Sequence, residues 1–241
     1  MGGSIRLFRF AGIQVSLHFS WFLVAAYWIS TSGRYSRPIW AVYEYVALFG
    51  IVLLHEFGHA LACRSVGGRA EHIVLWPLGG VAFVHPPPRP GPILWSLAAG
   101  PLVNVFLLPI IYLLNVFVRQ SPAFQDAPDA WIFFTYLGYI NFGLLIFNML
   151  PIYPLDGGQI LRALLWFPLG PIRSLQIASV IGMAGATALG LYAFSKGEIW
   201  LGIIAFFVFT HAIQGWQQAR AARAHPEVAQ EVPGEPQAPP R

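Results

Sequence analysis

Long apolar stretches recur along the whole chain and restrict the folds that it can adopt. Six of them, each about 17 to 26 residues long, are separated by short polar or proline-containing segments. A helix of about 20 apolar residues crosses the hydrocarbon core of a bilayer. The sequence therefore predicts an all-α polytopic membrane protein with about six spans. The predicted spans are Val15–Thr31, Ile39–Cys63, Ile93–Val118, Ala130–Leu150, Ile172–Phe194 and Glu198–Gly215.

The scarcity of charge supports this fold class. Only 10% of the 241 residues are charged, whereas soluble domains carry about 25%. The formal net charge is +4, but the 14 basic residues are spread between the apolar stretches and form no patch for nucleic acid. We therefore expect contact with membrane lipid and no nucleic-acid partner.

Two segments outside the predicted spans have the pattern of small β-hairpins at the membrane surface. Residues 4–17 alternate apolar and polar around Ala11–Gly12. Ala70–Pro77 and Val81–His85 are β-type runs on either side of a Gly-Gly pair. The proline-rich segment 85–92 is expected to be non-helical, because proline has no amide donor.

The distribution of positive charge predicts the orientation in the membrane. With six spans, and leaving aside Arg241 at the end of the tail, nine basic residues fall on the side of the two termini and four on the other side. Cytoplasmic loops carry an excess of Lys and Arg, so both termini are predicted to be cytosolic. Thirteen of the 14 basic residues are Arg, which suggests a GC-rich bacterial source and hence a bacterial cell membrane. Residues 1–216 are expected to form one membrane-embedded domain, and residues 217–241 a disordered cytosolic tail.

The second apolar stretch contains the sequence His55-Glu56-Phe57-Gly58-His59. On a helix, His55 and His59 lie one turn apart on one face, with Glu56 beside them, which is the arrangement of a zinc-binding helix. The same pattern occurs in soluble helices as a solvated face, but a helix in lipid has no such face. A carboxylate in a span costs about 2.5–3.5 kcal/mol, so Glu56 indicates a functional site.

A third ligand is expected after the fourth span. The second and fourth spans run in the same direction, so their ends lie at similar depth. Asp156 follows the fourth span, where Pro151 and Pro154 break the helix. A catalytic Zn²⁺ takes three protein ligands and keeps a fourth position for water. His55, His59 and Asp156 are thus predicted to bind one Zn²⁺ ion.

Glu56 is predicted to be the catalytic base of a metal-assisted peptide hydrolysis. It would accept a proton as water attacks a carbonyl carbon, and then protonate the leaving amine.

The two motifs together resemble the paired motifs of the site-2 protease family of intramembrane zinc metalloproteases. They are HEFGH at 55–59 and NMLPIYPLDG at 148–157. The likeness covers about residues 4–215 and is similar to the compact six-span branch, because neither the loop 64–92 nor the tail is long enough for a PDZ or CBS domain.

This resemblance implies cleavage of a transmembrane segment of another protein, with His55, His59 and Asp156 as ligands. It implies that Glu56 is the base and that Asn148 binds the substrate backbone or stabilises an oxyanion, although Asn148 could instead tie two helices together. Gly100 and Asn104 in the third span are also similar to the family, with packing as the alternative role.

The substrate must be extended before hydrolysis, since a helix hides its peptide bonds. The hairpin 74–84, with Gly79 and Gly80, is predicted to pair with it by strand addition. The partners expected are a transmembrane protein substrate and a membrane-tethered regulator, with the oligomeric state left open. Two other functions fit the same residues: a membrane carrier or sensor of divalent metal, and a non-catalytic scaffold that binds membrane proteins.

Other residues receive structural roles. His18, His72 and His85 are expected to anchor the chain at the interface, and Glu44 to lie at the outer interface, too far from His55 to reach the metal. The small residues Gly182, Gly185, Ala186 and Gly190 are expected to allow close helix packing.

Overall fold

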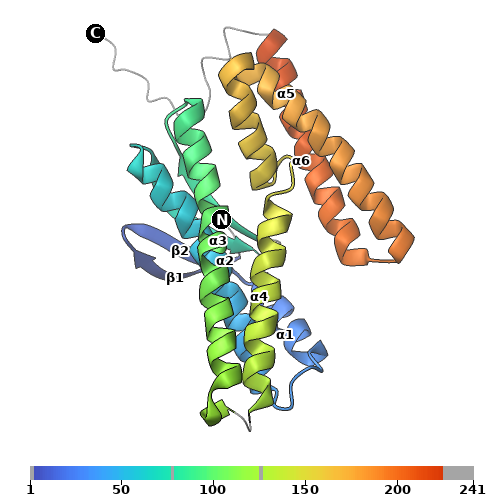
Figure 1. The fold of residues 1–241 in the computed structure, drawn as a ribbon. Helices are drawn as coiled ribbons and strands as arrows, with labels where there is room; N and C mark the ends of the chain where they lie inside the picture. The colour runs from blue at the N-terminus through green and yellow to red at the C-terminus, as the bar shows by residue number, and fades with distance from the viewer. Residues whose placement is uncertain (1–2, 77–78, 125–126, 225–241) are drawn as a thin grey trace. The chain divides into compact units, whose positions relative to one another are not determined.

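The computed structural model describes residues 3–76, 79–124 and 127–224, which are mostly helical (Figure 1). Those ranges hold six α-helices and one four-stranded sheet. The chain divides into two compact units, one of residues 1–87 with 95–148, and one of residues 88–94 with 149–241.

The elements of the first unit alternate between sheet and helix. They are β1 (Ser4–Phe10), β2 (Ile13–His18), α1 (Ser20–Thr31), α2 (Ile39–Ser65), β3 (Arg69–Trp76), β4 (Gly79–His85), α3 (Pro90–Gln120), the 3-10 helix η1 (Pro122–Phe124) and α4 (Pro128–Asn148). The first turn of α3 falls in the segment 88–94. The second unit contains α5 (Asp156–Lys196) and α6 (Ile199–Ala224).

Five helices, α2 to α6, are long and apolar enough to cross a membrane. The predicted fold class, a polytopic helical membrane protein with small β-hairpins, is confirmed. The first predicted span is wrong at its start, because Val15–His18 belong to β2, which pairs with β1 and with β3. The remaining helix, α1, has 12 residues and rises only about 18 Å.

Both predicted hairpins are present and belong to a single sheet of order β1-β2-β3-β4. The pairs β1–β2 and β3–β4 are antiparallel, and β2–β3 is parallel. Ala11 and Gly12 form the first turn, with φ of 48° and 75°. Strand β4 is an edge of this sheet.

One face of the sheet packs against the half of α2 that carries the histidines. The packed side chains include Ile13, Val15, Leu17, Ile73 and Leu75 from the sheet, and Val52, Phe57 and Ala60 from α2. This core fixes β3 and β4 against the predicted metal-binding turn.

At the other end of α2, Glu44 is fully buried and is held by α1 and by the loop between α1 and α2. Its carboxylate accepts hydrogen bonds from Trp28 Nε1 (3.0 Å), the Arg34 guanidinium (2.9 Å) and the Tyr35 hydroxyl. Burial, and then the hydrogen bond to Glu44, raise the pKa of the Tyr35 phenol. Glu44 precedes His55 by about 16 Å of helix, so it serves this network and not the metal site.

The start of α3 corrects the prediction for the proline-rich segment. Residues 90–92 are helical, although the whole segment 85–92 was expected to be non-helical. The first turn of a helix leaves its amide groups without intrahelical acceptors, so proline loses nothing there.

In the second unit, α5 has a kink at Gly170 (φ 77°, ψ 171°), between Pro168 and Pro171. Residues 156–169, before the kink, and the predicted fifth span after it both belong to helix α5. At its C-terminus, Gly197 adopts a left-handed conformation and caps the helix. Helix α6 runs to Ala224, so the first eight residues of the predicted disordered tail are helical, and residues 225–241 lie outside the described part.

The glycines of α5 do more than allow helix packing. A Cβ atom on Gly182 would lie 2.6 Å from the Tyr153 carbonyl oxygen, and one on Gly185 would lie 2.6 Å from Ile152 Cγ1. On α6, a Cβ on Gly215 would lie 2.9 Å from the Tyr153 ring. These glycines therefore make room for the loop that leads to Asp156.

Candidate metal centre

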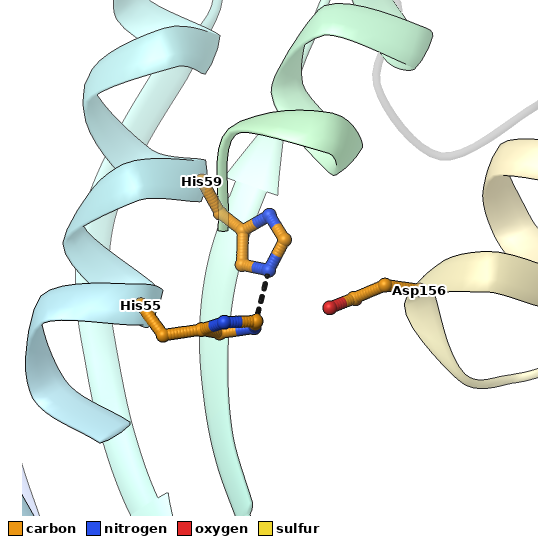
Figure 2. Close-up of side chains that lie close together, drawn as sticks. All are labelled: His55, His59 and Asp156. Carbon is orange, nitrogen blue, oxygen red and sulfur yellow. Dashed lines mark hydrogen bonds between the residues drawn. The ribbon is translucent and has the colours of Figure 1, made fainter. Parts of the chain in front are cut away.

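His55 and His59 occupy successive turns of α2 and are 3% and 6% exposed. Their Nε2 atoms are 3.0 Å apart (Figure 2). Two nitrogen ligands on a tetrahedral zinc ion lie about 3.3 Å apart, given bonds of about 2.0–2.1 Å. A small rotation of either ring would therefore suit one shared ion.

Asp156 is the first residue of α5 and follows the loop with Pro151 and Pro154. The ligand atoms of His55, His59 and Asp156 all lie within 4.8 Å of one another (Figure 2). Two imidazoles and a carboxylate are donors that zinc accepts, and three of them leave its fourth position open. The residues therefore fit a catalytic metal ion.

The other nitrogen of each ring contacts α3. His55 Nδ1 lies 2.6 Å from Asn104 Oδ1, and His59 Nδ1 lies 2.8 Å from the Ser96 carbonyl oxygen. A carbonyl oxygen only accepts hydrogen bonds, so His59 carries its proton on Nδ1 and has a lone pair on Nε2. This is the tautomer that binds a metal through Nε2.

One face of α3 is shaped around these two rings. Ser96, Gly100 and Asn104 recur every four residues and therefore share that face. A Cβ atom on Gly100 would fall well under 3.0 Å from the His59 ring. Sequence reasoning did not select Ser96 and left packing open for Gly100 and Asn104; the four-residue spacing was the available signal.

Glu56 lies beneath strand β4 and is 6% exposed. Its Oε2 atom accepts a hydrogen bond of 2.9 Å from the Ala82 amide. A Cβ atom on Gly80 would fall well under 3.0 Å from the Glu56 side chain. Strand β4 thus needs glycine at this position to cover the carboxylate.

Gly80→Ala is expected to lower any Glu56-dependent activity by about 10–100-fold, since the new methyl group must push the carboxylate away from the Ala82 amide. Zinc affinity should stay within about twofold of wild type, because neither imidazole is touched. Rates and zinc affinities of the purified variant would test this. In a Glu56→Gln background the substitution should add almost nothing; a full additional loss there would contradict the explanation.

The remaining predicted residues are placed as follows. Asn148 is the last residue of α4 and is half-buried, and Gly79 is the first residue of β4. Their proposed contacts with substrate stay predictions. His18 stacks on Trp76 with ring centroids 4.2 Å apart.

Two models of known protein families match this chain. A model described as "Peptidase M50B-like" matches residues 19–150, which include the two histidines and Glu56. A second model, "Peptidase family M50", matches residues 123–191, which include Asp156. The first match covers more than half of the chain. The chain belongs to peptidase family M50.

Relatives of this M50 protein agree with the assignment. A solved site-2 protease from Methanocaldococcus jannaschii superposes with a TM-score of 0.65 and 32% identity, covering 88% of this chain and 95% of that one. A curated zinc metalloprotease of the same organism is 35% identical over 214 residues, covering 89% of this chain and 61% of the relative. Rip3 of Mycobacterium tuberculosis is 28% identical over 240 residues, covering 88% and 58%. The chain thus spans about three fifths of the length of these two curated relatives, and the resemblance to site-2 proteases is confirmed.

Proposed function

We propose that this M50 protein is an intramembrane zinc endopeptidase that hydrolyses a peptide bond in or near a transmembrane segment of another protein. The observation that carries the proposal is the group of His55, His59 and Asp156 ligand atoms within 4.8 Å of one another. The names of the relatives, a zinc metalloprotease and a site-2 protease, support the choice of metal and reaction.

His55, His59 and Asp156 would hold the ion, each through one atom. When bound, zinc supplies Lewis-acid chemistry that polarises a carbonyl oxygen and makes a water molecule reactive at neutral pH.

Glu56 would move the proton. Its carboxylate takes a proton from water as the new carbon–oxygen bond forms at the scissile carbonyl. It then delivers that proton to the amide nitrogen as the carbon–nitrogen bond breaks, so the products are a carboxyl group and an amine. The Ala82 amide holds Glu56 Oε2 at 2.9 Å and so fixes the base during both transfers.

The edge of strand β4 is the proposed substrate-binding element. In an antiparallel pair, alternate residues direct their amides away from the partner strand. The Ala82 amide donates to Glu56 Oε2, so β4 passes beside the base. An extended substrate that adds to this edge, near Gly79 and Gly80, would bring its backbone to Glu56.

The proposed location is a bacterial cell membrane with both termini in the cytosol. The support is the nine-to-four distribution of basic residues, which counts the short helix α1 as a sixth crossing segment. A transmembrane protein is the proposed substrate, and a membrane-tethered regulator is a further proposed partner.

The decisive experiment uses the purified full chain in lipid vesicles with fluorogenic peptides. The peptides carry an apolar transmembrane sequence interrupted by a Gly-Pro pair, which keeps the cleavage region extended. Cleavage should disappear on chelation and return on addition of zinc. A chain that binds one zinc ion, cleaves none of the peptides and moves zinc across the vesicle membrane would be a carrier instead.

A further inference from the structure

Two asparagine side chains form a buried connection between α3, α4 and a metal ligand. Asn104 of α3 and Asn141 of α4 are both fully buried, although both helices can span a membrane. Buried amide groups are costly unless they are hydrogen-bonded. The Oδ1 atom of Asn104 contacts His55 and its Nδ2 atom contacts Asn141, so both polar atoms of the side chain are hydrogen-bonded.

The direction of these hydrogen bonds follows from one backbone group. Asn141 Nδ2 lies 2.9 Å from the carbonyl oxygen of Asn104, which can only accept. The other end of the same amide, Asn141 Oδ1, is 2.7 Å from Asn104 Nδ2, which donates to it. Asn104 therefore has its own oxygen, Oδ1, on the side of His55.

This orientation selects the tautomer of His55. Asn104 Oδ1 is an acceptor 2.6 Å from His55 Nδ1, so Nδ1 must carry the proton and Nε2 the lone pair. The Ser96 carbonyl selects the same tautomer in His59. Each Nε2 atom then has a lone pair that could be donated to a metal ion, and the two atoms are 3.0 Å apart.

We infer that Asn104 is a positioning residue for the metal ligand His55, and that Asn141 fixes the orientation of the Asn104 amide. The inference rests on the proposed function, since it concerns the same metal centre. Groups that hydrogen-bond the second nitrogen of a ligating histidine typically contribute about 10–100-fold to metal affinity. Asn104 thus sets the tautomer and ring orientation of His55 without touching the substrate.

Another asparagine distinguishes this role from helix packing. Asn115 also lies on α3, and its Nδ2 donates to Thr135 Oγ1 of α4 at 2.7 Å. It connects the same two helices but contacts no metal ligand among its hydrogen bonds. Asn115→Leu therefore removes an α3–α4 hydrogen bond as Asn104→Leu does, and leaves His55 alone.

The test measures the zinc dissociation constant of the purified full chain by competition with a chelator of known affinity. Asn104→Leu should weaken binding by about 10–100-fold, and Asn141→Leu by less. The double variant should bind as weakly as Asn104→Leu alone, because both residues act through one hydrogen bond. Asn115→Leu should lower the thermal unfolding temperature of the apo protein but change zinc affinity by less than about twofold.

Asn104→Asp keeps an oxygen facing His55 and should restore most of the affinity that Asn104→Leu loses. If wild type binds zinc and Asn104→Leu binds it equally well, the positioning role is wrong while the proposed function stands. If wild type binds no zinc, both the proposed function and this inference are wrong. Should Asn104→Leu not fold, Asn141→Leu decides: weaker zinc binding supports the role, and unchanged affinity overturns it.

Discussion

Replacing Glu56 with glutamine should reduce peptide cleavage by about 10²–10⁴-fold, the usual contribution of a general acid–base group. Glutamine has nearly the same shape and still accepts a hydrogen bond from the Ala82 amide, which lies 2.9 Å from Oε2 in wild type. It cannot accept the proton of an attacking water at neutral pH. Zinc affinity should change little, since His55, His59 and Asp156 are intact.

The measurement compares initial cleavage rates and zinc content of Glu56→Gln and wild type in the same vesicles. Glu44→Gln is the matched control, because it makes the same change at another buried glutamate of α2. That control should lose stability through the Trp28 and Arg34 hydrogen bonds but keep its rate per folded molecule. Equal loss of rate in both variants would mean that Glu56 acts through stability and not as a base.

Much of the metal centre could be predicted from the sequence because its key residues have local signals. The spacing of His55 and His59 specifies one helix face whatever the rest of the fold does. Asp156 could be added because two prolines end the preceding helix and place the carboxylate after it. The residues that support the ligands have a weaker signal, because Gly100 and Asn104 show only a four-residue spacing on one helix face. Ser96 acts through its backbone carbonyl, which every residue type has.

The sheet shows the same distinction between local and distant interactions. Each hairpin is encoded by an alternating pattern within about 15 residues, and the first also by the turn at Ala11 and Gly12. The parallel pairing of β2 with β3 joins segments separated by α1 and α2, so no local pattern encodes it. Val15–Leu17 take part in that pairing as well as in the pairing with β1, which shortens the first predicted span. The β2–β3 pairing also places β4, and with it Gly80, over Glu56.

Adding one methyl group to the face of α3 that contacts the histidines should have a large effect on zinc binding. Gly100→Ala should weaken zinc binding by at least about 100-fold and reduce cleavage in parallel, because the new Cβ would overlap the His59 ring. Losing the position of a ligand should cost at least as much as losing a supporting group, which costs about 10–100-fold. The change in helix propensity should not destabilise the apo protein, since alanine is about 1 kcal/mol more favourable than glycine in a helix.

Gly50→Ala on α2 is the matched control, because a Cβ atom there meets nothing within 4 Å. It has the same gain in helix propensity, so the difference between the variants isolates the contact with His59. Zinc affinity by chelator competition and thermal unfolding of the apo and zinc-loaded forms should be measured for both. Zinc should raise the unfolding temperature of Gly50→Ala as in wild type, and hardly raise that of Gly100→Ala. Full zinc binding by Gly100→Ala would show that His59 can turn away from α3 and still bind the metal, and that the shape of α3 does not define the site.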